Sequence, residues 1–390
     1  MQNQHEKQKI LVVDDVPQNI RLLEMNLKAD GYTVISANNG QEALEKVAKE
    51  KPDLILLDIM MPVMDGNEVC RWIRKNHNDR WIPVVMVTAF ESTPDKIAQS
   101  LDNGADDFIK KPFDRYELLA RVRSLLRVKG LQDELIGINK LLEDELTLAK
   151  DVQKALLPQE SPNIPCLDFS YRYIPSLIVG GDFFDIEEIT PSTVAVFICD
   201  VMGHGPQAAM ITGIVKALLT QLVRYYPSPD DLLEQMNNRF YDIMSSSSLP
   251  IFITAFCLVI DTQNGTGIYA NAGHPNPYLI RNRNSSTEEL SCEHGSALGF
   301  IPNISYQNGS FAMENGDMIF LFTDGLIEIK NENRVQFDTE EFQRAIQNNS
   351  NLSPQAFIEA MLSAADAFGG LYTEDDVTLL VFKYNQAGVD

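Results

Sequence analysis

The chain has 390 residues, 44% of them apolar and 22% charged, and a formal net charge of −23. This length predicts two or three domains, each with its own core. The negative charge argues against nucleic acid and against anionic membrane surfaces as partners, because both are bound through basic patches.

Cysteine usage and the N-terminal end predict the compartment. The five cysteines are scattered without a CxxC pair, so neither a disulfide framework nor a zinc site is expected. The first nine residues are polar, unlike a secretory leader. The longest apolar run, 251–260, is half the length of a bilayer span. We therefore expect a cytoplasmic protein that does not enter a membrane.

Residues 1–125 alternate short β-branched runs with amphipathic helical patterns. The predicted strands are 10–13, 33–37, 54–57, 84–87 and 108–109, and the helical patterns are 17–30, 41–50, 66–76, 94–103 and 114 onward. Five such units predict a doubly wound, flavodoxin-like parallel sheet with helices on both faces. In these sheets the functional site lies at the carboxyl ends of the strands.

Polar side chains stand at those strand ends. Asp14 and Asp15 end the first strand, Asp58 the third and Thr88 the fourth, while Lys111 follows the fifth. Three converging carboxylates repel one another unless a hard cation such as Mg²⁺ neutralises them. One carboxylate could then attack phosphorus while the lysine and the hydroxyl hold the phosphoryl oxygens.

These segments resemble the receiver domain of bacterial response regulators. The matching motifs are VVDD (12–15), LLDIMMPVMDG (56–66), VTA (87–89) and FIKKPF (108–113). The resemblance implies that Asp58 accepts a phosphoryl group from a histidine kinase and that Thr88 and Phe108 form a switching pair. It also implies that Lys111 contacts the phosphoryl group, ahead of a cis peptide at Pro112. The implied Mg²⁺ ligands are Asp14, Asp15, Asp58 and the backbone carbonyl of Met60.

Residues 114–158 predict one continuous helix. Apolar residues recur at steps of three or four, which places them on one helical face, and no proline intervenes before Pro158. A helix of about 40 residues is about 60 Å long, which exceeds one domain. Two interpretations stay open for the linker 126–157. It is either a rigid spacer or, as the long apolar face favours, a two-stranded coiled coil that makes the chain a homodimer.

Residues 158–390 show short strands separated by turn residues, which predicts antiparallel sheets. The predicted strands are 168–175, 182–188, 193–199, 251–260, 266–273, 277–281, 318–322 and 377–383. The predicted helices are 206–225, 229–245 and 353–368. The polar segment 284–289 is predicted to be a surface loop.

Four acidic motifs mark this C-terminal part. They are VGGDFFD (179–185), DVMGHG (200–205), FTDGLIE (322–328) and EDDVT (374–378). A single aspartate beside glycine is common in turns. Four such motifs without a basic cluster imply divalent cations as the missing positive charge. Because thiolate and imidazole clusters are lacking, Mg²⁺ or Mn²⁺ is favoured over zinc.

This arrangement resembles metal-dependent (type 2C) Ser/Thr protein phosphatases of the SpoIIE/RsbU branch, together with AKDVQKALLP (149–158) and NAGHPNPYLI (271–280). The resemblance implies an α/β/β/α sandwich and two Mn²⁺ or Mg²⁺ ions bridged by Asp200. Asp182 and the Val201 carbonyl would complete one ion, and Asp324 and Asp375 the other. A metal-bound water would then hydrolyse phosphoserine or phosphothreonine. The helix end near 151–157 would help to position the metal-binding segments.

The histidines and two further aspartates have open roles. His204, in a glycine-rich turn before a helix, is either the acid that protonates the leaving alkoxide or a satisfied loop residue. His274 is expected to be structural. Asp185 and Asp376 are candidates for support of the ligands or for capping.

The whole chain is therefore interpreted as a phosphatase of a two-component pathway, controlled by phosphorylation of its receiver. By resemblance, its substrate would be a phosphorylated STAS-type anti-sigma-factor antagonist. The alternative is a non-catalytic adaptor that binds a sigma-factor regulator under receiver control. Retention of Asp182, Asp200, Asp324 and Asp375 favours the enzyme.

Overall fold

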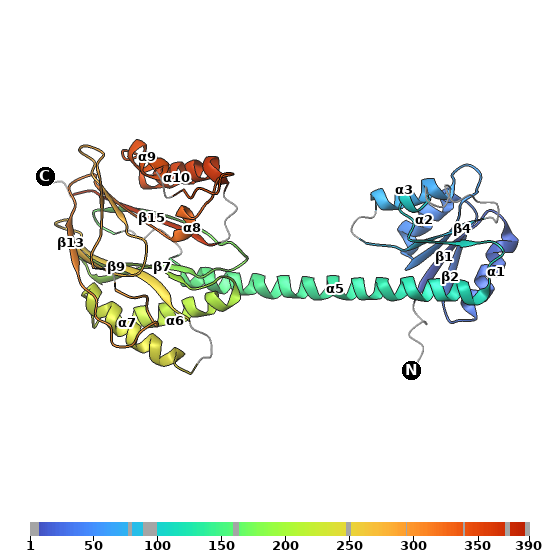
Figure 1. Cartoon of the computed structure of the whole chain (residues 1–390), viewed down its shortest axis with the longest axis horizontal. Coiled ribbons are helices and arrows are strands. Elements are labelled where there is room, and N and C mark those ends of the chain that lie inside the picture. Colours follow the sequence, from blue (N-terminus) through green and yellow to red (C-terminus); the bar gives the residue numbers. More distant parts are fainter. Residues whose placement is uncertain are drawn as a thin grey trace. The chain divides into compact units, whose positions relative to one another are not determined.

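The structure is a computed structural model that describes residues 8–76, 80–88, 100–158, 164–246, 251–293, 295–337, 340–370 and 375–386. The chain falls into two compact units, Met1–Leu142 and Glu143–Asp390. Helix α5 (Arg115–Leu156) begins in the first unit and ends in the second (Figure 1). None of the described helices combines the length and the apolar character that a bilayer span requires.

The first unit is a five-stranded parallel sheet in the order β2-β1-β3-β4-β5, which confirms the predicted doubly wound fold. Its strands are β1 (Lys9–Val13), β2 (Thr33–Ala37), β3 (Leu54–Asp58), β4 (Val84–Thr88) and β5 (Asp107–Lys110). Its shorter helices are α1 (Pro17–Lys28), α2 (Gly40–Glu50) and α3 (Gly66–Asn76). Apolar cores fill both faces of the sheet. This explains why its strands are continuous apolar runs rather than alternating ones. Of the helix predicted at 94–103, residues 94–99 lie outside the described part, as does Ala89.

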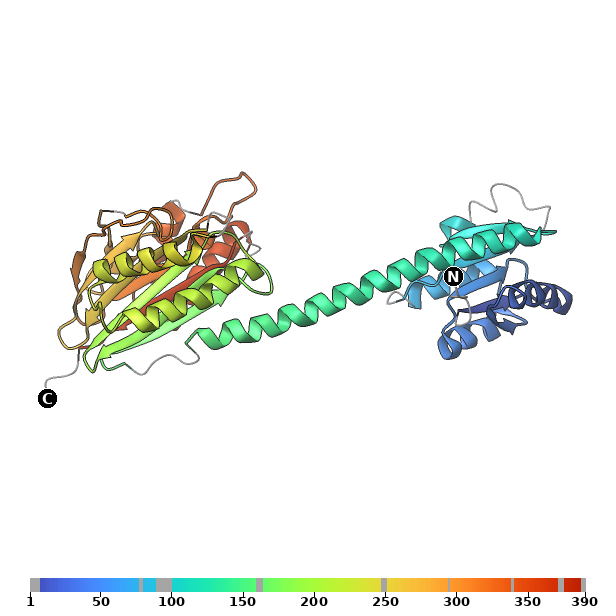
Figure 2. The same ribbon diagram turned by 90° about the horizontal axis from the view of Figure 1, so that it is seen from below.

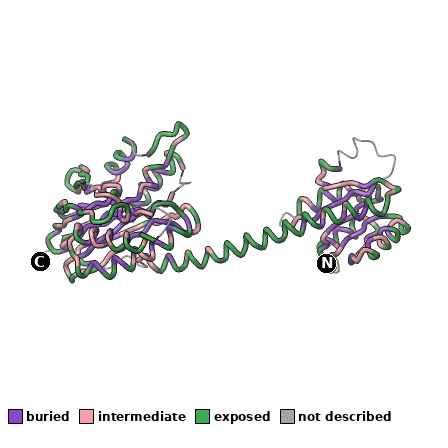
Figure 3. The backbone as a smooth tube through the Cα atoms, turned by 60° about the horizontal axis from the view of Figure 1, so that its bottom comes forward, coloured by how far each residue is buried: buried purple, intermediate pink, exposed green. Residues whose placement is uncertain are grey.

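Helix α5 is continuous, as predicted, although it contains Gly130 and Gly137. Its first turns are buried against the sheet through Leu118, Val122 and Leu126. Beyond them the helix is largely exposed (Figure 3). The exposed apolar side chains include Leu131 (59%), Leu135 (57%), Ile138 (48%) and Leu142 (51%). The predicted apolar face therefore exists, and within this chain most of it is uncovered.

The second unit contains two five-stranded sheets, ordered β13-β10-β9-β8-β7 and β12-β11-β14-β15-β6, whose neighbouring strands pair antiparallel. The first sheet comprises β7 (Asp182–Thr190), β8 (Thr193–Val201), β9 (Ile253–Asp261), β10 (Thr266–Ala272) and β13 (Gly309–Ala312). The second comprises β6 (Leu167–Ile174), β11 (Tyr278–Ile280), β12 (Thr287–Glu289), β14 (Met318–Phe322) and β15 (Val377–Tyr384).

Helices cover the outer face of each sheet, so the predicted α/β/β/α sandwich is confirmed (Figure 1). Helices α6 (Pro206–Leu222) and α7 (Pro229–Met244) lie side by side on the first sheet (Figure 2). Helices α9 (Glu340–Asn348) and α10 (Pro354–Gly369) cover the second, and α8 (Asp324–Ile327) is a single turn after β14. The larger core lies between the sheets and under α6 and α7, and a smaller one lies under α9 and α10.

Some elements differ from the sequence-based expectation. The loop predicted at 284–289 is wrong for Thr287–Glu289, which form strand β12. These polar residues become a strand because they pair with β11 at the edge of the sheet, and nothing local to their sequence indicates that pairing. Strand β13 and helices α8 and α9 were likewise not predicted. All five cysteines are free, as expected.

Two candidate metal centres

The first candidate centre lies at the carboxyl ends of β1 and β3. One oxygen each of Asp14, Asp15 and Asp58 lies within 4.8 Å of the other two. Asp14 and Asp58 are buried, whereas Asp15 is exposed. The structure therefore brings together the three carboxylates predicted from the sequence, at the spacing of ligands to a single ion. Oxygen ligands of this kind suit Mg²⁺.

Lys111 lies beside two of these carboxylates. Its Nζ donates to Asp14 Oδ2 at 2.7 Å and to Asp58 Oδ1 at 2.6 Å, and the Lys111–Pro112 peptide is cis, as expected. Burial raises the pKa of Asp58, and Asp14 and Asp15 add to this effect, while Lys111 opposes it. The lysine thus supplies part of the positive charge that this site needs and can hold further anionic oxygens.

Of the proposed switching residues, Thr88 pairs with Lys111 through its backbone, and Phe108 lies beside α5. Thr88 is buried at the end of β4, and Phe108 is half-buried on β5. The guanidinium of Arg121, on α5, lies 5.9 Å from the centre of the Phe108 ring and also pairs with Asp107 at 2.7 Å. Met60 is placed by its own N–H, which donates to Asp58 Oδ2 at 3.2 Å. A change in the position of the Phe108 ring would therefore alter its contact with Arg121 in the first turns of α5.

The second candidate centre is built by both sheets of the second unit. Asp182 and Asp200 are direct partners across the antiparallel pair β7–β8. Asp182 Oδ2 accepts hydrogen bonds from Thr323 Oγ1 at 2.7 Å and from Thr378 Oγ1 at 2.6 Å, both in the segments that end β14 and begin β15. Like charges directly opposite on neighbouring strands destabilise a sheet, so this pair needs a compensating charge.

Asp324 and Asp375 complete the acidic cluster. Burial raises the pKa of Asp200 to about 8, with further increases from Asp324, Asp375 and Asp376. Burial likewise raises the pKa of Asp324 to about 6, and the pKa values of Asp182 and Asp375 are also raised, chiefly by burial. Asp324 Oδ1 is buried without a hydrogen-bond partner among the described residues. Glu374, at the start of the same motif as Asp375, lies outside the described part.

These residues fit divalent metal ions. A buried carboxylate oxygen without a donor is costly, and a cation would satisfy it. Carboxylates of this kind can hold two ions that share ligands, as in two-metal hydrolases.

Glycines and Asp376 fix the loop that carries Asp182. A Cβ on Gly181 would lie 2.8 Å from the Val201 carbonyl oxygen, so only glycine allows this close approach. Asp376 is buried, and its carboxylate accepts hydrogen bonds from the N–H groups of Ser176 and Gly181. Its position favours the supporting role that the sequence left open.

Asp185 and the two histidines of the motifs have distinct surroundings. Asp185 is buried and paired with Lys216 on α6, and burial raises its pKa to about 6. His274 is buried, shares a hydrogen bond of 2.9 Å with Thr254, and has its pKa lowered to about 3 by burial, as suits a structural residue. His204 is exposed in the turn before α6, close enough to Asp375 to offset a small part of the rise that burial causes in the pKa of that carboxyl group.

Gln153 makes a contact with Gly180 that was not predicted from the sequence. Its side chain is buried near the end of α5, where Nε2 donates to the Gly180 carbonyl at 2.7 Å. In return, the Gly180 N–H donates to Gln153 Oε1 at 3.2 Å. The sequence signals for it were its place in the motif AKDVQKALLP (149–158) and its polar side chain within the apolar face of the helix. This amide pair ties α5 to the loop before Asp182.

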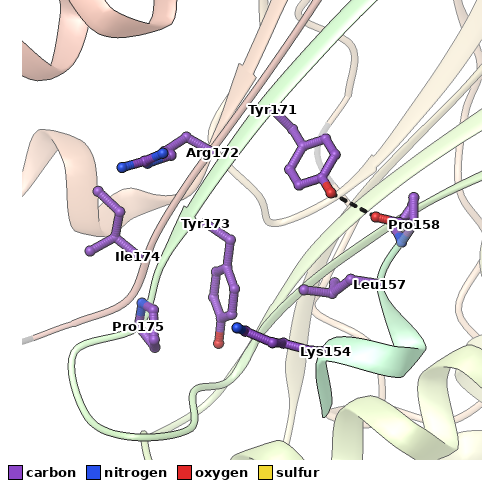
Figure 4. Close-up of a pocket in the computed structure, with 8 residues that line it drawn as sticks. All are labelled: Lys154, Leu157, Pro158, Tyr171, Arg172, Tyr173, Ile174 and Pro175. Atoms are coloured by element: carbon purple, nitrogen blue, oxygen red, sulfur yellow. Dashed lines mark hydrogen bonds between the residues drawn. The ribbon is translucent and has the colours of Figure 1, made fainter. Parts of the chain in front are cut away.

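A cavity of about 580 Å³ lies between the end of α5 and strand β6 (Figure 4). Lys154, Leu157 and Pro158 line one side of it, and residues 171–175 line the other. Across this cavity, the Tyr171 hydroxyl donates a hydrogen bond to the Pro158 carbonyl at 2.7 Å. Together with the Gln153 pair, this contact fixes the last turn of α5 on the second unit, as expected for 151–157.

Metal-free protein is expected to lose stability as the pH rises from 6 to 8.5. The folded-state pKa values of Asp200 (about 8) and Asp324 (about 6) lie above the ordinary 3.8. The folded protein therefore holds protons that the unfolded chain releases. The resulting stability is complete below pH 3.8 and is lost as the pH rises through the folded values.

Thermal melts with and without Mg²⁺ would test this expectation. Each kcal/mol shifts the melting temperature by about 2–4 °C in a domain of this size, so the rise caused by Mg²⁺ should be several degrees larger at pH 8.5 than at pH 6. An equal rise at both pH values would contradict the metal assignment.

Comparison with known proteins supports both halves of this architecture. The family model described as "Stage II sporulation protein E (SpoIIE)" matches residues 190–385, and that of the response regulator receiver domain matches residues 10–123. The SiaA-PP2C domain of Pseudomonas aeruginosa shares the fold of the second unit. It has a TM-score of 0.57 and 21% identity, and the match covers 64% of this chain and 99% of that domain.

Two curated relatives are response regulators or transcriptional regulators by their names. Response regulator PleD of Caulobacter vibrioides is 51% identical over 127 residues, which is 33% of this chain and only 28% of PleD. The probable transcriptional regulator ycf27 of Pyropia yezoensis is 49% identical over 237 residues, covering 60% of this chain and 92% of that protein. With its acidic centres and these matches, the chain belongs to the SpoIIE family and carries a response regulator receiver domain at its N-terminal end.

Proposed function

We propose that this chain is a metal-dependent protein serine/threonine phosphatase controlled by phosphorylation of its receiver. One observation carries the proposal. Asp182, Asp200 and Asp324 are gathered from both sheets into one site, where Asp182 is buried and one oxygen of Asp324 is buried without a donor among the described residues. Receiver and type 2C phosphatase domains generally use divalent ions, and such ions would supply the charge that this cluster lacks.

In this proposal Asp182, Asp200, Asp324, Asp375 and the Val201 carbonyl would hold two Mn²⁺ or Mg²⁺ ions. When bound, the ions would lower the pKa of a water toward neutrality. Thr323 and Thr378 hold Asp182 in place through their hydroxyls.

His204 is exposed near this cluster, where it can donate a proton to the departing alkoxide of the substrate. Asp376 supports the site by holding Gly181 and is not assigned as a ligand.

Control by the receiver is proposed to run through α5. Asp58 would accept the phosphoryl group from a histidine kinase, and Asp14, Asp15, Asp58 and the Met60 carbonyl would hold the Mg²⁺ that this transfer requires. Thr88 and Phe108 then change position, and Arg121 transmits the change to α5. At its other end, Gln153 holds Gly180 beside Asp182. A coupling of about 1–3 kcal/mol would give a 5- to 150-fold response.

The remaining assignments are proposals of the same kind. We place the receiver at 1–125, a coiled-coil linker that makes a homodimer at 126–157, and the phosphatase domain at 158–390. The substrate would be a phosphorylated protein such as a STAS-type anti-sigma-factor antagonist, in the cytoplasm. Turnover of p-nitrophenyl phosphate with Mn²⁺ tests the activity directly. If neither the protein alone nor the receiver-phosphorylated protein hydrolyses it, the non-catalytic adaptor is the better interpretation.

Replacing Asp58 by alanine is expected to separate control from chemistry. Asp58 belongs to the first centre only, so the basal Mn²⁺-dependent rate should stay within about twofold of wild type. Any change in rate caused by a small-molecule phosphoryl donor such as acetyl phosphate should disappear. As a control, the exposed Asp102→Ala should keep the response. Complete inactivity of Asp58→Ala under all conditions would contradict a purely regulatory role.

A further inference from the structure

Four large apolar side chains gather beside the second acidic centre without being buried. Met202, Phe300 and Ile301 are 49%, 62% and 47% exposed, and Phe252 is half-buried. The rings of Phe252 and Phe300 lie 5.8 Å apart at 79°, an edge-to-face contact. We call Met202, Phe252, Phe300 and Ile301 the apolar ridge.

The ridge begins just beyond the end of strand β8, which carries Asp200. Met202 lies two residues beyond Asp200, and its N–H donates to the Phe252 carbonyl at 3.0 Å, which extends the pairing of Val201 with Ile253. Ile253 in turn exchanges both backbone hydrogen bonds with Leu298, so the segment that carries Phe300 and Ile301 lies next to the same strand. A protein segment whose phosphorylated residue entered the centre would pass close to these side chains.

The segment that carries Phe300 is held in place by α7. Asn237 is fully buried, accepts from the Gly299 N–H at 2.8 Å and donates to the Ile301 carbonyl at 2.9 Å. Gly299 has a φ of +81°, and a Cβ there would lie 2.6 Å from the Phe240 ring. One buried amide thus fixes the backbone on both sides of Phe300.

This arrangement does little for folding, because it keeps large apolar side chains in solvent. Rigidly held, exposed aromatic and aliphatic groups are instead typical anchors of binding surfaces, since little freedom is lost when a partner covers them. The neighbouring centre is rich in carboxylates, and the chain carries a net charge of −23. Affinity for a phosphorylated, anionic partner is therefore better supplied by apolar contact than by charge.

We propose that the apolar ridge binds apolar side chains that flank the phosphorylated serine or threonine of a protein substrate. The inference rests on the proposed phosphatase function and adds a substrate class to it. An extended segment advances about 3.3 Å per residue, so side chains one to four positions from the phosphoserine are within reach. A second copy of this chain is the rival occupant.

Two synthetic phosphoserine peptides of equal length and charge would test the ridge. One has leucine and isoleucine within four residues of the phosphoserine, and the other has serine and glutamine there. With Mn²⁺, wild-type protein should show a KM for the first peptide at least about fivefold lower than for the second. The double variant Phe300→Ala/Ile301→Ala should bring this ratio close to one, while its turnover of p-nitrophenyl phosphate stays within about twofold of wild type.

Tyr225→Ala is the matched control, because Tyr225 is 78% exposed and lies beyond the far end of α6 from the metal-binding turn. It should keep the full peptide preference. Fluorescence anisotropy with labelled peptides measures the same preference as binding and needs no turnover, so loss of activity alone would count against the proposed function and not against the ridge. Equal affinity of wild-type protein for both peptides, or an unchanged preference in the double variant, would overturn the inference. A halved mass of the double variant in light scattering, with no peptide preference in wild type, would assign the ridge to a second copy instead.

Discussion

Asp324→Asn is expected to lower the Mn²⁺-dependent turnover of p-nitrophenyl phosphate at least about a hundredfold, since loss of a ligand removes several kcal/mol of metal-supplied stabilisation. Asp324 begins the short helix α8 just after β14, and its Oδ1 is buried without a donor among the described residues. An amide there cannot supply the negative charge that a divalent ion requires. Steady-state kinetics over a range of Mn²⁺ concentrations would measure the loss.

The same substitution should leave the metal-free fold intact. Because burial raises the pKa of Asp324 to about 6, a neutral amide removes an unfavourable charge at pH 8 and should not lower the melting temperature. The increase in melting temperature caused by Mn²⁺ should shrink in the same variant. Glu328→Gln is the matched control, since Glu328 also raises the pKa of Asp324 but is not assigned as a ligand. Wild-type turnover in Asp324→Asn would refute the proposed second centre.

Replacing Leu135 and Leu142 by glutamine is expected to convert a dimer into a monomer. Both side chains lie on the apolar face of α5 and are more than half exposed within one chain. In a symmetric coiled coil each substitution is made twice in the same seam, and each buried Leu lost from a core costs about 2–5 kcal/mol. Light scattering should then report the chain mass of 43.8 kDa in place of twice that value.

Ile136→Gln is the control for this experiment. Ile136 is 50% exposed, similar to Leu142 at 51%, but it lies one residue after Leu135 and so faces about 100° away from the seam. Its substitution should leave the dimer unchanged. A wild-type protein that is already monomeric at micromolar concentration would remove the coiled coil and favour the rigid spacer.

The receiver site could be predicted almost completely from the sequence. In a parallel sheet the strand ends meet at one edge, so Asp14, Asp15, Asp58 and Lys111 had to converge once the strand order was known. The strand order of the second unit cannot be inferred from its sequence in the same way. Its aspartates meet because two sheets pack together, one with β7 and β8 and the other with β14 and β15. The contact of Asp182 with Thr378 spans 196 residues of sequence.

A receiver, a long helix and an acidic C-terminal part could all be predicted from the amino-acid sequence, because these features follow from local periodicity and from motifs at strand ends. Three contacts became visible only in the folded chain: Asp376 supports a glycine loop, Gln153 joins α5 to that loop, and Asn237 holds the backbone around the exposed Phe300. Each of these contacts depends on a hydrogen bond between residues far apart in sequence. The free energy of such a bond is realised only after the sheets have packed, and no local pattern of residues encodes it.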